Sequence, residues 1–326
     1  MTTATHSLTV SRVAGHIGAA VSGVDLAQDL PESTIAEIRA ALLEHKVLFF
    51  RGQEGLDHAR QVVFGSRFGE LTGRARPQSG GALDEFPQIL TISPQIDIDA
   101  YGVDYEKHYR SRLHHGIGAW HGDMTHTVNP PAGAVLRADT LPSRGGDTQW
   151  TNLEAAYAGL PADLQGFLDG LRAEHTFFAA YDMSPYDEVD KQVMDRVNAS
   201  PQVAVHPVVR VHPETGRKAL FVSPARVRRI LWLSPMESRH LLELLTREVT
   251  RPEYTVRFTW EPGSVAFWDN RCTAHIGVGD VDAVGEPRVM YRVTLLGDRP
   301  VGPDGFVSTK TDGQEQTACP ASVQDR

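Results

Sequence analysis

The sequence predicts an α+β, mainly β protein: a β-sandwich or jelly roll with two or three helices packed outside it. Many short apolar or alternating runs are bounded by Gly, Pro, Asn and Asp, which is typical of strands joined by turns. Regular βαβ alternation, internal repeats and a Gly-rich phosphate loop are absent from the sequence. A single β-rich domain with added helices can reach this length of 326 residues.

We therefore expect one domain over residues 1–301. Residues 302–326 are polar and contain few apolar side chains that could anchor them to a core. This stretch is interpreted as a disordered or loosely docked tail.

A first helix is predicted near the start of the chain. In "ESTIAEIRAALLEH", Thr34 and Glu37 have the spacing of a capping box, and the apolar residues that follow recur on one helical face. The run at 46–50, which includes "VLFF", then predicts a strand.

A second helix is predicted by "SPMESRHLLELLTREV". Ser234 and Glu237 form another capping-box pattern, and Pro235 occupies the first helical position, where no N–H is needed. A third, shorter helix is predicted over about 161–171 despite its two glycines.

Strands are predicted between these helices, with a hairpin turn at 212–219. The strand-forming runs are 133–141, 148–152, 206–222, 254–260, 264–270 and 288–298.

The composition excludes several classes of function. A formal net charge of −9 argues against bulk binding to nucleic acid or to anionic lipid. The apolar runs are too short to cross a bilayer, and no secretory signal begins the sequence, so we expect a cytoplasmic location. Cys272 and Cys319 are interpreted as free thiols, and the basic run "RVRR" at 226–229 as solvated surface.

The stretch "WHGDMTH" contains a candidate metal site. His121 and Asp123 are two residues apart, so on an extended segment their side chains point to the same side. Alone, this pair fits a polar strand end as well as half of a metal site. In "FWDNRCTAHI", however, a predicted strand ends in a polar turn and His275 follows on the loop.

Two histidines and one carboxylate that bind one face of an octahedral ion are the arrangement of non-haem Fe(II) oxygenases. The three open positions of that ion can take a bidentate 2-oxo acid and O₂. A structural zinc site is the alternative, and it would need a fourth ligand, for which Cys272 is the nearby candidate.

The run "RVMYRVTLLGD" contributes two cations. Arg288 and Arg292 are four residues apart and face the same way on a strand. Buried guanidiniums need anions, so the pair predicts two bound anions. An edge strand with both arginines in water is the alternative.

Together these residues resemble the taurine dioxygenase (TauD/TfdA) family of Fe(II)- and 2-oxoglutarate-dependent oxygenases. The likeness runs through most of the chain, including "HKVLFFRGQ", "WHGDMTH", "PPAGAVLRADTLPSRGGDTQWTN", "FWDNRCTAHI" and "RVMYRVTLLGD". The resemblance implies a double-stranded β-helix, with Fe(II), 2-oxoglutarate and O₂ as cofactors, and no catalytic group beyond the metal centre. By position it implies these roles: iron ligands His121, Asp123 and His275; 2-oxoglutarate contacts Thr148 and Arg288; substrate contact Arg292.

The resemblance leaves the substrate open. His126 and Met124 stand beside the ligand pair, and Tyr181 follows in "HTFFAAYD"; these three are candidate substrate contacts that differ from taurine-type relatives. The segment 98–120 is longer than in the taurine and alkyl-sulfate branches. It is interpreted as a possible active-site lid, with a surface loop without function as the alternative.

The expected function is oxidation, most simply hydroxylation, of a C–H bond in a small and anionic organic substrate, with release of succinate and CO₂. The alternatives are a natural-product tailoring oxygenase that desaturates or cyclises a larger substrate, and a non-catalytic metal-binding jelly-roll protein. A zinc hydrolase would need a general base for which the sequence offers no clear candidate. Association into a homo-oligomer is possible, but no heptad or apolar patch identifies how.

Overall fold

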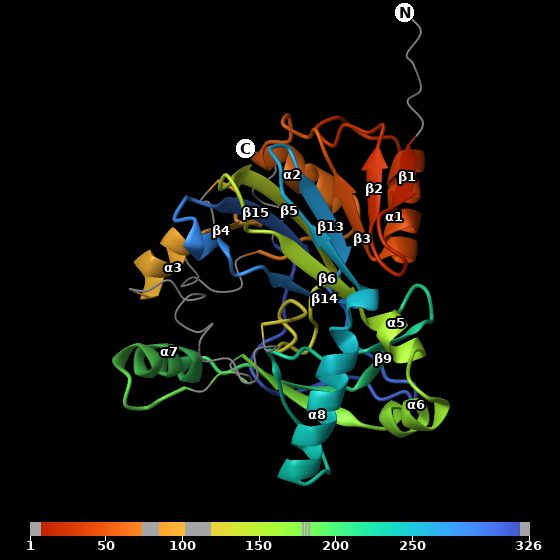
Figure 1. The fold of residues 1–326 in the computed structure, drawn as a ribbon, viewed down its shortest axis with the longest axis vertical. Helices are drawn as coiled ribbons and strands as arrows, with labels where there is room; N and C mark the ends of the chain where they lie inside the picture. Colours follow the sequence, from red (N-terminus) through yellow and green to blue (C-terminus); the bar gives the residue numbers. More distant parts are fainter. Residues whose placement is uncertain are drawn as a thin grey trace, which may run out of the picture.

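The computed structural model describes residues 8–73, 85–101, 119–177, 179, 181 and 183–319. Figure 1 shows two groups of elements: sheets with helices outside them above, and a smaller group of strands and helices below. Most of the predicted lid insertion, residues 102–118, lies outside the described residues.

The largest sheet has seven strands, and apart from the parallel pair β2–β3 its neighbours are antiparallel. In spatial order the strands are β1 (Thr9–Arg12), β2 (Ala19–Ser22), β3 (Val47–Phe50), β13 (Val265–Asp269), β5 (Gly133–Thr140), β15 (Val289–Leu295) and β4 (Ile89–Ile92).

A three-stranded antiparallel sheet faces one side of this sheet. It consists of β12 (Thr255–Phe258), β6 (Thr148–Asn152) and β14 (Thr273–Gly277). Phe49 stacks on Phe258 with ring centroids 4.2 Å apart, and Trp268 packs against Trp150 at 5.8 Å. The two sheets therefore enclose one aromatic-rich layer of the core.

Two helices cover the opposite side of the seven-stranded sheet. α1 (Glu32–His45) and α2 (His58–Ser66) bury residues such as Ile38 and Phe64 against that sheet. Because β3 is covered on both faces, its four residues, Val47–Phe50, are all buried, which accounts for the unbroken apolar run in the sequence.

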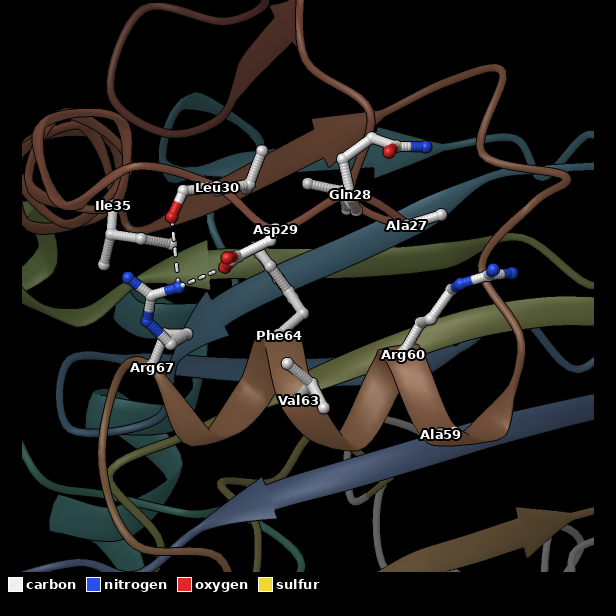
Figure 2. Close-up of a pocket in the computed structure, with 11 residues that line it drawn as sticks. Ala27, Gln28, Asp29, Leu30, Ile35, Ala59, Arg60, Val63, Phe64 and Arg67 are labelled. Atoms are coloured by element: carbon white, nitrogen blue, oxygen red, sulfur yellow. Dashed lines mark hydrogen bonds and ion pairs between the residues drawn. The ribbon is translucent and has the colours of Figure 1, made fainter.

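The first helix begins earlier than predicted. α1 starts at Glu32, its N-cap is Pro31, and no side chain caps it, so Thr34 and Glu37 lie inside the helix. The predicted capping box was wrong here. Arg67, just after α2, fixes the segment before α1 instead: its Nη1 donates to the carbonyl oxygen of Leu30 at 3.0 Å (Figure 2).

A second group of strands and helices surrounds a separate part of the core. Its strands are β7 (Arg172–Thr176), β8 (Val203–Pro207), β9 (Val209–Val211), β10 (Lys218–Leu220), β11 (Val227–Ile230) and β16 (Thr309–Asp312). Its helices are α5 (Leu153–Ala158), α6 (Ala162–Asp169) and α8 (Pro235–Val249). The described elements also include α3 (Pro94–Tyr101), α7 (Glu188–Ala199) and two short 3-10 turns, Pro252–Tyr254 and Val281–Ala283.

Several predicted elements of this group are confirmed. In α8, the Ser234 side chain accepts from the Glu237 N–H and the Glu237 carboxylate accepts from the Ser234 N–H, with Pro235 in the first turn. The hairpin joins β9 to β10, and the short helix after Pro161 is α6. The strand-forming runs at 133–141, 148–152, 254–260, 264–270 and 288–298 also contain strands. The mixture of sheets with helices outside them is as predicted.

The segment after residue 301 differs from the expected disordered or loosely docked tail. β16 pairs with β8, and Ser308 is fully buried against His206, with 2.7 Å between Oγ and Nδ1. Gln316 donates to the carbonyl oxygen of Asn129, and the Cys319 N–H to that of Leu71. Backbone and side-chain hydrogen bonds anchor this segment through residue 319 in place of apolar side chains.

In the described part of the chain, no helix has the length and apolar character that crossing a bilayer requires.

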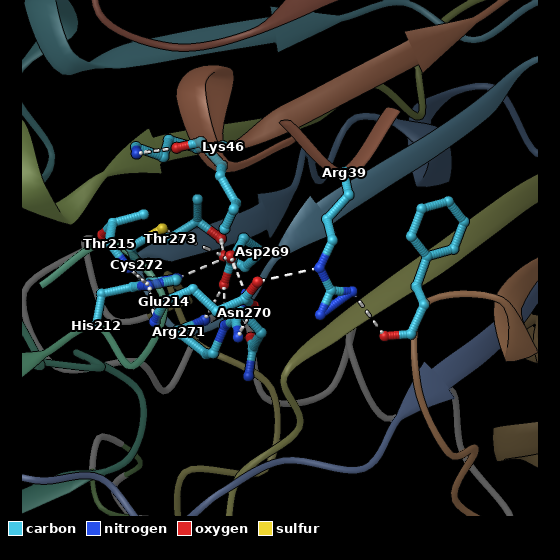
Figure 3. A network of polar contacts seen from close by, with 12 residues as sticks. Arg39, Lys46, His212, Glu214, Thr215, Asp269, Asn270, Arg271, Cys272 and Thr273 are labelled. Carbon is cyan, nitrogen blue, oxygen red and sulfur yellow. Dashed lines mark hydrogen bonds and ion pairs between the residues drawn. The ribbon is translucent and has the colours of Figure 1, made fainter. Parts of the chain in front are cut away.

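A buried polar network fixes the turn between β13 and β14 (Figure 3). Asp269 accepts from Arg271 through both oxygens, at 2.8 and 2.6 Å, and its Oδ2 lies 3.0 Å from His212 Nε2. Arg271 also pairs with Glu214 at 2.7 Å, and Glu214 pairs with Arg39 at 3.0 Å. The Asp269 carboxylate is fully buried, and despite that burial the contacts with Arg271 and His212 lower its pKa.

Replacing Asp269 with Ala should therefore destabilise the fold strongly. The change removes the carboxylate that binds the buried Arg271 through both oxygens and leaves Arg271 with Glu214, at a cost of about 3–5 kcal/mol. Denaturant unfolding should show a large fall in the transition midpoint. Asp29→Ala, which removes an exposed carboxylate paired with Arg67, is the matched control and should move the midpoint little. Equal effects of the two changes would contradict the structural role of the network.

Candidate metal centre

The structure brings His121, Asp123 and His275 together. One possible ligand atom from each lies within 4.8 Å of the others. His121 and His275 face each other in an antiparallel bridge: the His121 N–H donates to the His275 carbonyl at 2.9 Å, and the reverse bond is 2.7 Å. The sequence placed His275 on a loop, and this was wrong, because His275 lies within β14 opposite Trp150 of β6.

Asn270 holds the segment that carries Asp123, the ligand loop (residues 121–127). Its Oδ1 accepts from the Asp123 N–H at 2.8 Å, and its Nδ2 donates to the carbonyl oxygens of Asp123 and Pro131 at 3.1 and 3.0 Å. Asn270 is itself buried in the turn that precedes β14. One side chain thus joins the backbone at Asp123 to the strand of His275, a role that the sequence pattern did not reveal.

His206 supports the same loop from the other side. Its Nε2 lies 2.8 and 3.1 Å from the carbonyl oxygens of Thr125 and Thr127, while its Nδ1 faces Ser308. Burial is the main reason that the pKa of His206 falls to about 3. A neutral ring with its Nε2 proton toward these two carbonyls satisfies the geometry.

The electrostatics of the cluster favour an ionised carboxylate and neutral imidazoles. Burial would raise the pKa of Asp123, but the Arg292 cation and the two histidines outweigh it and lower the pKa to about 2. Burial, together with the neighbouring His121, lowers the pKa of His275 to about 3. Burial and the charge of Arg226 also lower the pKa of His121.

This donor set fits a divalent metal ion. His121 Nδ1 lies 2.9 Å from the carbonyl oxygen of Ala119, which assigns its proton to Nδ1 and leaves Nε2 with a lone pair. Asp123 Oδ2 and His275 Nδ1 are buried, and neither has a hydrogen-bond partner among the described residues. Metal ligation would satisfy such atoms.

A second group, His212, Asp269 and Cys272, also has metal-ligand spacing but is already satisfied. Both Asp269 oxygens bond to Arg271 or His212, and His212 Nδ1 accepts from the N–H groups of Glu214 and Thr215. Burial raises the pKa of Cys272 well above its ordinary value, which keeps the thiol protonated. This group is a structural network, so the zinc site suggested by Cys272 has no support in the geometry.

Thr148 and Arg288 both lie beside the loop that precedes β6. Thr148 begins β6, and its Oγ1 accepts from Trp260 Nε1 at 3.0 Å. Gly146, two residues earlier, packs against Arg288, since a Cβ at Gly146 would lie 3.0 Å from Arg288 Nε. Gly146 has a φ of 72°, so it combines a left-handed backbone with the close approach of the guanidinium.

Arg292 reaches the cluster from the opposing seven-stranded sheet. In β15, Val293 and Leu295 face the layer under α1 and α2, whereas Met290 faces the aromatic layer between the sheets. By the alternation of the strand, Arg292 shares the side of Met290. Its Nη1 donates to Asp123 Oδ1 at 2.7 Å.

The remaining predicted site residues lie near the cluster or just after β7. His126 is buried on the ligand loop, with its ring edge-on to Phe177 at 5.1 Å. Met124 is partly buried and takes a left-handed φ of 48° within this turn. Tyr181 is partly buried in the segment after β7.

The sequence predicted that the whole basic run at 226–229 is solvated surface. The structure confirms this only for part of the run. The Arg228 and Arg229 side chains are exposed and pair with Glu174 at 3.4 and 3.0 Å. Arg226 is partly buried, with its guanidinium carbon 4.3 Å from the centre of the Phe177 ring. Its charge also lowers the pKa of His121, so sequence reasoning missed a cation beside the cluster.

The family model described as "Taurine catabolism dioxygenase TauD, TfdA family" matches residues 9–294, nearly the whole chain. The chain belongs to the TauD/TfdA family. It is 38% identical to an alpha-ketoglutarate-dependent sulfate ester dioxygenase of Pseudomonas putida, over 95% of this chain and 97% of that protein. It is 36% identical to an alkylsulfatase of Acinetobacter baylyi, over 94% and 90% of the two chains.

Among solved structures, a taurine dioxygenase from Burkholderia xenovorans superposes with a TM-score of 0.80. The two proteins are 43% identical, and the match covers 97% of each chain. The architecture of this chain is therefore that of a TauD-type protein.

Titration with Co(II) should show one tightly bound ion per chain. Asp123→Ala should abolish tight binding because it removes the anionic donor of the cluster. Cys272→Ala should keep the full stoichiometry, since the second cluster has no donor to offer. The visible absorption bands of bound Co(II) measure the binding. If Cys272→Ala loses the ion and Asp123→Ala keeps it, the metal site is the second cluster and the assignment made here is wrong.

Proposed function

We propose that this chain hydroxylates a C–H bond of a small organic anion, and that sulfate esters are the substrate class. The coarser activity follows from the family: the chain is an Fe(II)- and 2-oxoglutarate-dependent dioxygenase, an oxidoreductase with Fe(II), 2-oxoglutarate and O₂ as cofactors. A non-catalytic binding protein is thereby excluded. The names of two relatives, a sulfate ester dioxygenase and an alkylsulfatase, support the choice of sulfate esters.

His121, Asp123 and His275 are the proposed iron ligands. The observation that carries this assignment is the convergence of two neutral imidazoles and one ionised carboxylate within 4.8 Å. Such a set leaves one face of an octahedral ion open for cosubstrate and O₂. When bound, Fe(II) and 2-oxoglutarate supply the oxidation, in which 2-oxoglutarate becomes succinate and CO₂ and one oxygen atom is transferred to the substrate.

Thr148 and Arg288 are the proposed contacts of the distal 2-oxoglutarate carboxylate. The Thr148 hydroxyl accepts from Trp260, so its own proton is available to an acceptor. The guanidinium of Arg288 offers N–H donors in a plane, which match a carboxylate. The close packing of Gly146 against Arg288 supports a fixed position for this cation.

Arg292 is the proposed contact for the substrate anion. One of its N–H groups bonds to Asp123, and its buried Nε has no hydrogen-bond partner among the described residues. A substrate anion on the remaining N–H groups would be held beside the metal ligand. The side chains of Met124, His126 and Tyr181 are proposed to line the rest of the substrate site.

Hydroxylation of a sulfate ester accounts for loss of sulfate. The C–H bond on the carbon that bears the ester oxygen becomes C–OH. That carbon then carries both a hydroxyl and a sulfate group, so the hydroxyl proton leaves, a C=O bond forms and sulfate departs with the C–O electron pair. The protein holds the anion, orients the C–H bond and excludes water.

We also assign the two facing sheets to the double-stranded β-helix of the family. The antiparallel order β12–β6–β14 opposite β13, β5 and β15 supports this assignment.

Anaerobic spectroscopy tests the function directly. Fe(II) and 2-oxoglutarate added to the metal-free protein should give the weak visible charge-transfer band of the chelate, and hexyl sulfate should then shift it. Aerobic turnover should release sulfate, hexanal and succinate in equal amounts. No band despite bound iron would contradict the cofactor assignment, and a shift only with an aryloxyacetate would replace sulfate esters with carboxylates.

Arg288→Ala should raise the 2-oxoglutarate concentration required for half-maximal formation of the band. Loss of a charge-assisted pair costs about 1.5–3 kcal/mol, which corresponds to a roughly ten- to hundredfold weaker interaction. Arg239→Ala, an exposed change on α8, is the control. An unchanged 2-oxoglutarate requirement would remove Arg288 from the cosubstrate site.

A further inference from the structure

Met124, the residue after Asp123, has a strained backbone conformation. Its φ of 48° lies in the left-handed region, which L side chains rarely adopt because the Cβ comes too close to the following carbonyl oxygen. A residue keeps such a conformation only when its surroundings hold it there. The turn at Met124 sets the path of the ligand loop beyond Asp123, so the groups that hold this turn also help to orient the Asp123 carboxylate.

Thr127 closes the turn with two hydrogen bonds to one acceptor. Its backbone N–H donates to the carbonyl oxygen of Met124 at 2.9 Å, and its side-chain hydroxyl donates to the same oxygen at 2.8 Å. The second bond forms only while the hydroxyl proton is directed at Met124. A donor that approaches the Thr127 hydroxyl oxygen from another side would keep the proton in that direction.

Gln316 supplies this donor. Its Nε2 donates to Thr127 Oγ1 at 3.0 Å and to the carbonyl oxygen of Asn129 at 3.0 Å. A carbonyl oxygen can only accept, so the amide must present its nitrogen rather than its oxygen at this position. The Thr127 hydroxyl therefore accepts from Gln316 and donates to Met124, which connects the Gln316 side chain to the residue after Asp123.

Asn129 fixes the position of Gln316. Its Oδ1 accepts from the Gln316 N–H at 2.9 Å, and its Nδ2 donates to the Gln316 carbonyl oxygen at 3.0 Å. Asn129 is buried and lies 187 positions before Gln316 in the chain. Together with the bond from Nε2, these contacts form a reciprocal clasp (Asn129 and Gln316) that directs the Gln316 side chain at Thr127.

The C-terminal segment is also attached on both sides of Gln316. Before it, β16 pairs with β8, and after it the Cys319 N–H donates to the carbonyl oxygen of Leu71 at 2.8 Å. These backbone hydrogen bonds dock the segment without the Gln316 side chain. The contact of that side chain with Thr127 therefore points to a role beyond docking.

We propose that Gln316 is a positioning residue for the candidate metal centre: it holds the left-handed turn at Met124 through Thr127 and so orients the Asp123 carboxylate. The inference rests on the proposed function, since it takes Asp123 as a metal ligand. Residues that orient a ligand without touching the metal typically contribute roughly ten- to hundredfold to metal affinity. Gln316 acts at the lower end of this range, because Thr127 stands between it and the ligand loop's Met124.

Co(II) titration of the metal-free protein compares Gln316→Met with Gln314→Met. Methionine has about the length of glutamine but no N–H to donate. Gln316→Met should bind Co(II) about tenfold more weakly, because the Asp123 carboxylate is no longer held in place. Gln314 is exposed and contacts Gln202 through its backbone N–H, so Gln314→Met should match the unchanged protein. Equal affinity in Gln316→Met and the unchanged protein would overturn the inference.

A second substitution tests the route through Met124. Glycine takes a positive φ without steric cost, so in a Met124→Gly background the turn no longer has to be held against strain. Gln316→Met should then weaken Co(II) binding by about threefold or less, against about tenfold in the chain that keeps Met124. A merely structural role of Gln316 predicts the same loss in both backgrounds, and that result would contradict the inference.

Amide hydrogen exchange in the metal-free protein gives a readout that involves no metal. Gln316→Met should speed exchange in a peptide that covers residues 122–129, which contains the Thr127 N–H, and leave a peptide from α8 unchanged. Faster exchange in both peptides, or in neither, would count against a positioning role. If Gln316→Met does not fold, Gln316→Glu replaces it, because glutamate keeps the shape of the side chain and removes the donating amide.

The outcomes distinguish this inference from the proposed function. If Asp123→Ala abolishes Co(II) binding and Gln316→Met leaves it unchanged, the role of Gln316 is wrong and the ligand assignment stands. If Asp123→Ala keeps tight Co(II) binding, the ligand assignment fails, and the inference about Gln316 fails with it.

Discussion

Two backbone hydrogen bonds between His121 and His275 are the constraint on which the rest of the site depends. They join the ligand loop to β14, and β14 in turn pairs with β6, so both imidazoles take their positions from a sheet. Asn270 adds the third attachment through the backbone of Asp123. The buried network around Asp269 fixes the turn that carries Asn270, so the core determines the geometry of the candidate metal centre. This rigidity suits a site that must hold reacting groups in place.

The distribution of charge makes one of the two clusters the better candidate for a metal site. At His121, Asp123 and His275, the donors are neutral or anionic, and two of their buried atoms have no hydrogen-bond partner among the described residues. In the second group, hydrogen bonds from Arg271 and His212 already occupy both carboxylate oxygens of Asp269, which a metal ion would need as ligands. The possible ligand atoms lie within 4.8 Å of one another in both groups. The hydrogen bonds that these atoms already make, rather than their spacing, therefore distinguish a candidate ligand set from a structural ion-pair network.

Sequence reasoning succeeded where the signal was local. The capping box at Ser234 and the hairpin at β9–β10 each depend on residues a few positions apart. It failed where distant parts of the chain decide. His275 looked like a loop residue because its pairing partners, His121 and Trp150, are far away in sequence. Arg226 looked like its neighbours because Phe177, whose ring and carbonyl oxygen it contacts, lies 49 positions earlier in the chain.

The docked segment after residue 301 bears on how the protein matures. Ser308 contacts His206, which supports the ligand loop, and Gln316 donates to Thr127, a residue 189 positions earlier in the chain. Since a ribosome makes the chain from its amino end, the loop is synthesised long before these two supports exist. The hydrogen bonds from Ser308 and Gln316 can form only after both residues have left the exit tunnel. The candidate metal site therefore acquires these two supports only after the core around it has been synthesised.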